Sequence, residues 1–149
     1  MADAPRILIV EARFYEEIAD ELARGAIAAL DAAGAAHDRV SVPGAFEIPA
    51  AIALAGRSPE GGYDGYVALG CVIRGETSHY DYVCVESARA LQDLATRDGL
   101  AIGYGILTCE TGEQAWERAK VDRKNKGRDA AEACLAMVAL KRRFPAAAG

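Results

Sequence analysis

Residues 66–84 read YVALGCVIRGETSHYDYVC, and this stretch determines the class of fold. Its first part, Tyr66–Ile73, is a continuous apolar run with β-branched residues, which is typical of a parallel strand buried on both faces. The polar turn Arg74–Ser78 ends the run, and a helical pattern begins at Tyr80. A buried strand that leads through a short turn into a helix predicts an α/β domain, with His79, one of two histidines, at the turn.

The alternation of strand and helix continues along the whole chain. Strands are predicted at Arg6–Val10 (ending near Glu11 or Ala12), Arg39–Val42, Tyr66–Ile73 and Leu100–Leu107. Helices are predicted at Glu16–Ala33, Glu47–Leu54, Tyr80–Thr96, Thr111–Ala119 and Arg128–Arg143. The last helix should face the core with Ala130, Ala133, Cys134, Met137 and either Val138 or Leu140. This order predicts a parallel sheet with right-handed crossovers in a single domain over residues 1–149.

Composition excludes several classes of function. The formal charge of −5 argues against a broad electrostatic surface for nucleic acid or for an anionic membrane. No apolar run approaches the roughly 20 residues of a membrane helix, and Met1–Arg6 lack the layout of a signal peptide. We therefore expect a cytoplasmic protein.

The cysteines and histidines are too scattered for a metal site. The four cysteines contain no C-x-x-C pair, and both histidines are isolated in the sequence. We expect free cysteines, with Cys84 and Cys134 buried as small apolar residues, and neither disulfides nor metal.

Four segments are expected to meet at one edge of the sheet. Ligands of open parallel sheets bind beyond the carboxyl ends of the strands, where the loops gather. This rule selects Ala12–Phe14, Pro43–Glu47, Arg74–His79 and Thr108–Glu110. The backbone amides of Gly75–Ser78, before a helix, suit a phosphate, but Thr77 or Ser78 could equally serve only as a helix cap.

Single side chains at this edge allow a functional or a structural interpretation. Histidine as a residue type titrates near neutral pH, so His79 suits proton transfer, yet a lone histidine is often structural. Phe14 and Phe46 follow strands in loops, where an exposed aromatic is expected to pack or stack. Glu47 either caps its helix or accepts hydrogen bonds from a polyol. Two basic residues outside these loops could be ordinary surface residues, namely Arg118 and Lys126.

Taken together, the motifs resemble those of the lumazine synthase family. The matching segments follow in order over nearly the whole chain: Arg13–Phe14, Val42–Pro49, Gly70–Cys84, Gly105–Thr108, Glu113–Ala115 with Arg118–Ala119, and Asn125–Gly127. Each motif is modest, but the ordered set is specific. The resemblance implies a flavodoxin-like three-layer αβα sandwich with a four-stranded parallel sheet. It also implies no metal or organic cofactor, and a homopentamer with active sites between neighbouring subunits.

The resemblance further implies a reaction, the penultimate step of riboflavin biosynthesis. Enzymes of this family join 5-amino-6-(D-ribitylamino)uracil to 3,4-dihydroxy-2-butanone 4-phosphate and form 6,7-dimethyl-8-ribityllumazine. The resemblance assigns pyrimidine stacking to Phe14, proton transfer to His79 and a phosphate clamp to Arg118. The phosphate would also meet the backbone amides of Glu76 and Thr77. Further substrate contacts are expected from Ala45, Phe46, Glu47, Cys71, Val72, Ile73, Lys126 and, reaching the adjacent subunit, Tyr104.

Three positions depart from the pattern of the family. Tyr15 follows Phe14 where many members have Asn, and Tyr104 replaces a commoner Phe. The bridge Lys120–Asn125 contains no glycine, whereas members that close into sixty-subunit shells usually have one there. We therefore expect a free pentamer. Two other functions stay open: a flavin or lumazine carrier with weak catalysis, and a cage-forming assembly protein.

Overall fold

Four parallel strands form one sheet in the computed structural model, which describes residues 3–147. They are β1 (Arg6–Ala12), β2 (Ala36–Val42), β3 (Gly65–Ile73) and β4 (Ile102–Cys109). The order across the sheet is β2-β1-β3-β4, so β1 and β3 lie in the centre and β2 and β4 form the edges. All carboxyl ends therefore meet at one edge of the sheet, as the sequence predicted.

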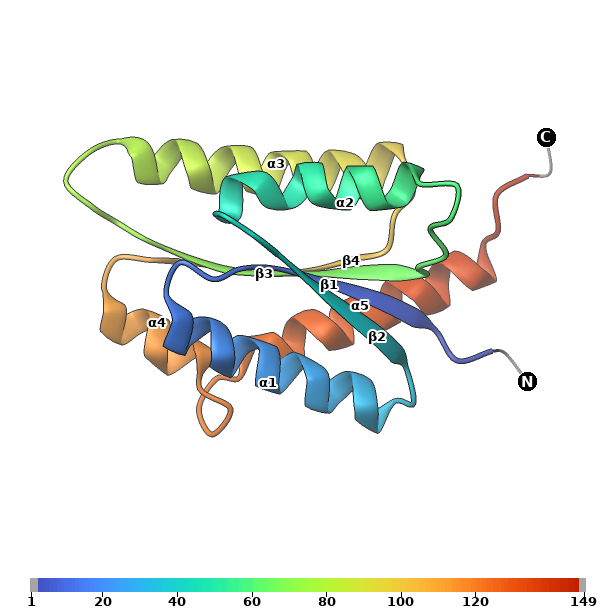
Figure 1. Ribbon diagram of the computed structural model, residues 1–149, viewed down its shortest axis with the longest axis horizontal. Coiled ribbons are helices and arrows are strands. Elements are labelled where there is room, and N and C mark those ends of the chain that lie inside the picture. The colour runs from blue at the N-terminus through green and yellow to red at the C-terminus, as the bar shows by residue number, and fades with distance from the viewer. Residues whose placement is uncertain (1–2, 148–149) are drawn as a thin grey trace.

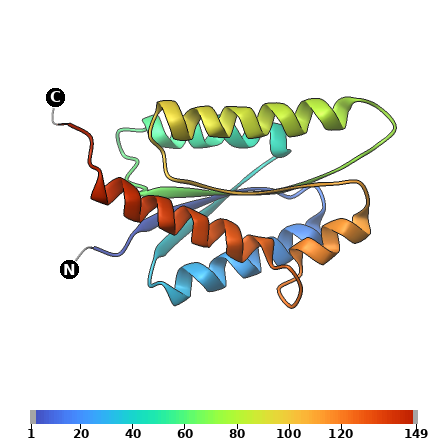
Figure 2. The same ribbon diagram turned by 180° about the vertical axis from the view of Figure 1, so that it is seen from behind.

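Helices cover both faces of the sheet (Figure 1). On one face lie α1 (Glu16–Ala32), α4 (Gly112–Ala119) and α5 (Lys126–Arg143). On the other face lie α2 (Ile48–Arg57), which follows a 3₁₀ turn at Ala45–Glu47, and α3 (His79–Arg97). The view from behind shows the same three layers (Figure 2). The αβα sandwich predicted from the sequence is confirmed.

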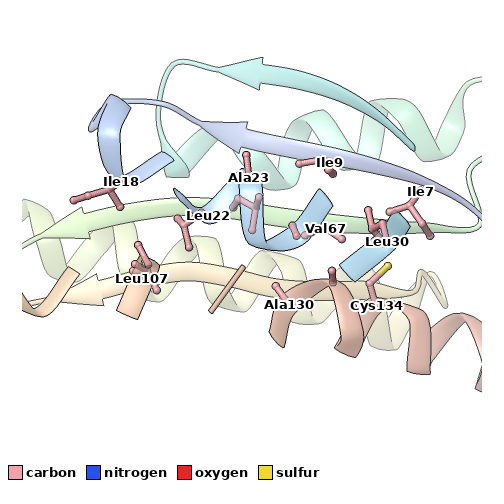
Figure 3. Packing of buried hydrophobic residues seen from close by; sticks show 14 of the residues in the cluster. Ile7, Ile9, Ile18, Leu22, Ala23, Leu30, Val67, Leu107, Ala130 and Cys134 are labelled. Carbon is pink, nitrogen blue, oxygen red and sulfur yellow. The ribbon is translucent and has the colours of Figure 1, made fainter. Parts of the chain in front are cut away.

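The sheet separates two apolar cores because side chains alternate along each strand. Ile7 and Ile9 of β1 enter the core beneath α1 and α5, whereas Leu8 and Val10 enter the core beneath α2 and α3. Figure 3 shows the first of these cores, in which Cys134 of α5 lies beside the strands. This two-sided burial explains why the central strands are continuous apolar runs.

The edge strands differ from the sequence prediction. β2 begins at Ala36 and not at Arg39, because residues 36–38 pair with residues 6–8 of β1 despite the polar side chains of His37 and Asp38. An edge strand with much exposed surface tolerates such residues. β4 covers Ile102–Cys109 and not Leu100–Leu107, because its pairing with β3 continues to Ile73.

Helix α5 differs from the prediction in its start and in its buried face. It begins at Lys126 and not at Arg128, because the Asn125 side chain caps it by accepting from the Arg128 amide at 3.4 Å. Two predicted core residues, Ala133 and Met137, are exposed, and of the two alternatives at the end of the helix Val138 is buried and Leu140 is exposed. The buried face instead consists of Gly127, Ala130, Ala131, Cys134 and Val138. Small residues occupy most of the buried face because they allow the backbone of α5 to approach the sheet closely.

All four cysteines are free, as predicted. Cys109 and Cys134 are buried, whereas Cys71 and Cys84 are half-buried. The prediction of a buried Cys84 is therefore wrong, because this position of α3 is only partly covered by neighbouring residues.

An ion pair at the amino edge of the sheet predicts a pH dependence of stability. The Asp38 carboxylate accepts hydrogen bonds from the Tyr63 hydroxyl at 2.7 Å and from Arg6 at 3.3 Å. The Tyr63 bond, followed by Arg6, holds the pKa of Asp38 below its usual value. Asp38→Asn should therefore lower the free energy of unfolding slightly at neutral pH.

The sign of the pH effect follows from the lowered folded-state pKa. The contribution of the Asp38 charge is fully present above the unfolded-state pKa of about 3.9, and it is lost as the pH falls through the lower folded-state value. Urea unfolding of both proteins at neutral and at strongly acidic pH checks this. A stability difference that grows in acid would contradict the prediction.

Candidate active site

A pocket of about 460 Å³ opens at the carboxyl edge of the sheet. Its walls come from the β1–α1 loop, the β2–α2 connection, the end of β3 and the start of α3. Eight residues predicted for the site line it: Phe14, Ala45, Phe46, Glu47, Cys71, Val72, Ile73 and His79. The pocket lies where open parallel sheets bind their ligands, and its size suits a small molecule.

Two aromatic side chains at the pocket are largely exposed. Phe14 exposes 75% of its surface and Phe46 exposes 58%. Phe14 contacts Tyr15 edge to face, with ring centroids 4.9 Å apart and an interplanar angle of 79°. Exposed rings at the mouth of a pocket are available to stack on a planar ligand.

The floor of the pocket is the end of β3, where Cys71, Val72 and Ile73 are half-buried. Burial raises the pKa of the Cys71 thiol to about 12, and burial also raises the pKa of the Tyr15 phenol. Neither group is ionised at neutral pH. Glu47 and His79 are the other two ionisable side chains of the lining, so acid–base chemistry in the pocket depends on them.

The turn before α3 presents unpaired backbone amides beside the pocket. Within the described chain, the amides of residues 75–78 donate to no protein acceptor. The Thr77 hydroxyl accepts from the His79 amide at 3.3 Å, and Ser78 makes no side-chain cap. Glu76 and Thr77 are exposed and lie next to the pocket but do not line it. The positive end of the α3 dipole and the free amides suit an anion.

Arg74 holds this turn in place. Its guanidinium donates to Glu110 after β4 at 2.8 Å and to Asp81 of α3 at 3.1 Å, and it lies over the Tyr80 ring at 4.3 Å. These contacts join the ends of β3 and β4 to the first turn of α3. These contacts therefore restrain the turn relative to the pocket floor.

Three predicted residues lie away from the pocket of their own chain. Tyr104 is on the edge strand β4 and exposes 46% of its surface. Arg118 is on α4, on the opposite face of the sheet from α3, and donates to the carbonyl of Gln114 at 3.1 Å. Lys126 begins α5 on that same face and pairs with Asp129 at 3.4 Å. Within a single chain, these three residues therefore lie away from Phe14 and His79.

Two lining residues lie outside every segment that the sequence predicted for the site, namely Tyr15 and Val83, whereas Pro43 and Gly44 belong to the predicted segment Pro43–Glu47 without a role of their own. Tyr15 is the direct neighbour of the predicted residue Phe14. Val83 lies four residues after His79 in α3, a spacing that places both on one side of a helix. The helical spacing from His79 could therefore have identified Val83 as a pocket residue from the sequence.

Neither a metal site nor a membrane helix is present in residues 3–147. In this range no group of three or more His, Cys, Asp or Glu side chains could hold a metal ion. No helix in the same range is long and apolar enough to cross a membrane.

Comparison with known proteins gives a consistent match. A family profile described as 6,7-dimethyl-8-ribityllumazine synthase matches residues 4–142. A protein of that name from Bartonella tribocorum is 62% identical over 144 residues, which are 97% of this chain and 95% of the relative. A protein from Rhizobium meliloti named 6,7-dimethyl-8-ribityllumazine synthase 1 is 61% identical, with 94% of each chain covered. A third relative, from Bartonella bacilliformis, is 60% identical over 94% of this chain and 92% of its own.

Proposed function

The chain belongs to the 6,7-dimethyl-8-ribityllumazine synthase family, and we propose that it performs the reaction of that family in the pocket at the carboxyl edge of its sheet. It condenses 5-amino-6-(D-ribitylamino)uracil with 3,4-dihydroxy-2-butanone 4-phosphate to 6,7-dimethyl-8-ribityllumazine, with release of phosphate and water. This is a transferase reaction of riboflavin biosynthesis. The observation that carries the proposal is the convergence of eight predicted residues on one pocket.

The pyrimidine occupies the aromatic part of the pocket. Phe14 stacks on its ring, and the largely exposed surface of Phe14 supports this role. Ala45, Phe46 and Glu47 hold the ring and the ribityl chain, and the Glu47 carboxylate accepts hydrogen bonds from the ribityl hydroxyls. Backbone groups of residues 71–73 contact the ring from the floor of the pocket.

The phosphate of the second substrate binds at the turn before α3. The unpaired amides of Glu76 and Thr77 and the helix dipole support this position. Only the backbone of Glu76 serves the anion in this proposal, because its carboxylate would repel a phosphate. His79 lies two residues after Thr77 and lines the pocket, which supports a proton-transferring group between the phosphate and the pyrimidine.

His79 acts as general acid and base. Imine formation, loss of phosphate, tautomerisation and ring closure with loss of water all move protons at the substrates, and one imidazole can serve them in turn. Holding two substrates in register supplies much of the remaining acceleration. These steps require no metal or organic cofactor, and we propose that the chain uses neither.

A neighbouring subunit completes the site in a homopentamer. Tyr104, Arg118 and Lys126 lie outside the pocket of their own chain, and the exposed positions of Tyr104 and Lys126 with the half-buried position of Arg118 support a contribution across a subunit boundary. The bridge at residues 120–125 has no glycine and uses Asn125 as its residue with positive φ. This feature supports a free pentamer over a shell, and native mass spectrometry separates five copies from sixty.

The cellular setting is inferred from the thiols. All four cysteines are free, which supports a reducing compartment and hence the cytoplasm. We further propose that residues 1–149 act as one domain, since both apolar cores share one sheet.

Incubation with both substrates tests the function. Lumazine absorbance and free phosphate should rise together in equal amounts. Tight flavin or lumazine binding without product would instead support a carrier, and a shell of sixty copies without turnover would support an assembly protein. The absence of product at every pH tested would exclude the enzyme.

Arg118→Ala tests the phosphate clamp. Loss of a charge-assisted hydrogen bond to phosphate is expected to raise KM for the butanone phosphate about 10- to 100-fold, with a smaller effect on KM for the pyrimidine. Steady-state kinetics with one substrate varied at a time measures both values. Arg97→Ala, at the far end of α3, is the matched control and should change neither. Equal KM values in Arg118→Ala and wild type would exclude the clamp.

A further inference from the structure

A buried carboxylate lies near the carboxyl end of β1 and outside the lining of the pocket. Glu11 of β1 has only 2% of its surface exposed and faces the α1 side of the sheet. One of its oxygens accepts from Arg13 Nη1 at 2.6 Å, and the other accepts from Arg39 Nε of β2 at 2.7 Å. A carboxylate loses much hydration free energy on burial, and here both oxygens are compensated by charged donors.

Arg13 connects this carboxylate to a third element. Its other terminal nitrogen donates to Asp20 of α1. The Asp20 and Glu11 bonds raise the pKa of Arg13, so the cation is maintained throughout the working pH range. Glu11, Arg13, Asp20 and Arg39 therefore form a clamp between β1, β2 and α1, and we call these four residues the Glu11 clamp.

The Glu11 clamp lies next to Phe14, a residue whose position its own packing does not fix. Phe14 follows Arg13 directly, is 75% exposed, and has Tyr15 as its aromatic neighbour in the described chain. An exposed ring gains little orientation from packing, so its place is set by the backbone on either side. On one side is Arg13 in the clamp, and on the other is Tyr15, which packs against the core beneath α1.

Stability alone does not account for a buried acid at this point. An ion pair in a protein interior often contributes no more stability than apolar residues of equal volume, but it imposes a directional geometry. The Glu11 clamp uses the fixed fork of a guanidinium, which binds two carboxylates from separate elements at once.

We propose that Glu11 is a positioning residue of the enzyme, which acts through Arg13 to hold the β1–α1 loop so that Phe14 stacks on the pyrimidine substrate. The inference rests on the proposed role of Phe14. Glu11 touches no substrate, and its effect is therefore confined to the substrate that Phe14 meets.

Kinetics of Glu11→Gln test this. The variant keeps the shape of the side chain and removes its charge. KM for 5-amino-6-(D-ribitylamino)uracil should rise about 10-fold or more, since small displacements of a positioning group have large effects, while KM for the butanone phosphate stays within about twofold. Asp38→Asn, which breaks an ion pair at the other end of the sheet, is the matched control and should change neither KM.

A double-mutant cycle separates positioning from general damage. In a Phe14→Ala background the ring is gone, so Glu11→Gln should no longer raise KM for the pyrimidine. Equal effects of Glu11→Gln in both backgrounds would overturn the proposal. If Glu11→Gln folds poorly, Arg13→Lys serves instead, because a lysine retains the charge but cannot bind both carboxylates with the same fork. It should show the same selective rise in KM.

Hydrogen exchange tests the clamp without turnover. The Ala19 amide, which donates to the Tyr15 carbonyl at 2.8 Å, should exchange faster in Glu11→Gln than in wild type, and at the wild-type rate in Asp38→Asn. Unchanged exchange of the Ala19 amide would overturn the clamp even if the wild-type enzyme is active. Faster exchange in a chain that makes no product would support the clamp and reject the proposed function, so the two failures are distinguishable.

Discussion

His79→Ala is expected to lower kcat about 100- to 10,000-fold, with the fold unchanged. This is the usual contribution of a positioned group that transfers protons in several steps. His79 lines the pocket at the first residue of α3, beside the unpaired amides, and no other histidine lies there. Steady-state kinetics with both substrates saturating measures kcat, and circular dichroism with thermal unfolding tests the fold.

His37→Ala is the matched control for this prediction. The His37 ring lies on β2, 2.9 Å from the Asp31 carboxylate, and does not line the pocket. Its replacement removes the same side chain and should leave kcat near the wild-type value. If His79→Ala retains kcat within about threefold of wild type, a different group moves the protons, and Glu47 becomes the next candidate because it is the other acid or base of the lining.

The layered fold was predictable because its signal is local. β1 and β3 are buried on both faces, and a run such as Ile7–Val10 has no other stable place than the centre of a sheet. The start of β2 was not predictable in this way. Residues 36–38 are polar on average and join the sheet only because β1 supplies partners for their backbone. Such pairing depends on tertiary contacts that hydrophobic periodicity does not report.

The same distinction applies to the site. The rule for parallel sheets predicted which loops meet, and Phe14, Phe46 and His79 do share one pocket. The rule does not say which face of the sheet a distant helix covers, and so the separation of Arg118 from the pocket needed the structure. Glu11 was missed for another reason. In a sequence, an acidic residue near the end of an apolar run suggests that the buried part of the strand has ended. In addition, Arg39, the partner of Glu11, is distant in the sequence.

Gly103→Ala is expected to destabilise the fold by about 3 kcal/mol, the upper part of the range for overpacking. A Cβ built on Gly103 of β4 would lie 1.9 Å from the Ala130 carbonyl oxygen and 3.0 Å from the Cys134 Cβ, both on α5. The obstacle is helix backbone, which cannot move aside as the end of a side chain can. Helix α5 must therefore shift outward along its contact with the sheet, and the midpoint of thermal unfolding should fall by about 6–12 °C.

Gly112→Ala separates this steric effect from the general effect of replacing a glycine. A Cβ at Gly112, in the first turn of α4, would meet nothing within 4 Å. Reduced freedom of the unfolded chain should then leave stability unchanged or raise it by about 0.5 kcal/mol. Both variants and the wild type are compared at one protomer concentration, because assembly makes stability depend on concentration. If Gly103→Ala unfolds at the temperature of Gly112→Ala, α5 does not lie against β4 as closely as the glycine contacts require, and the small-residue face of α5 needs another explanation.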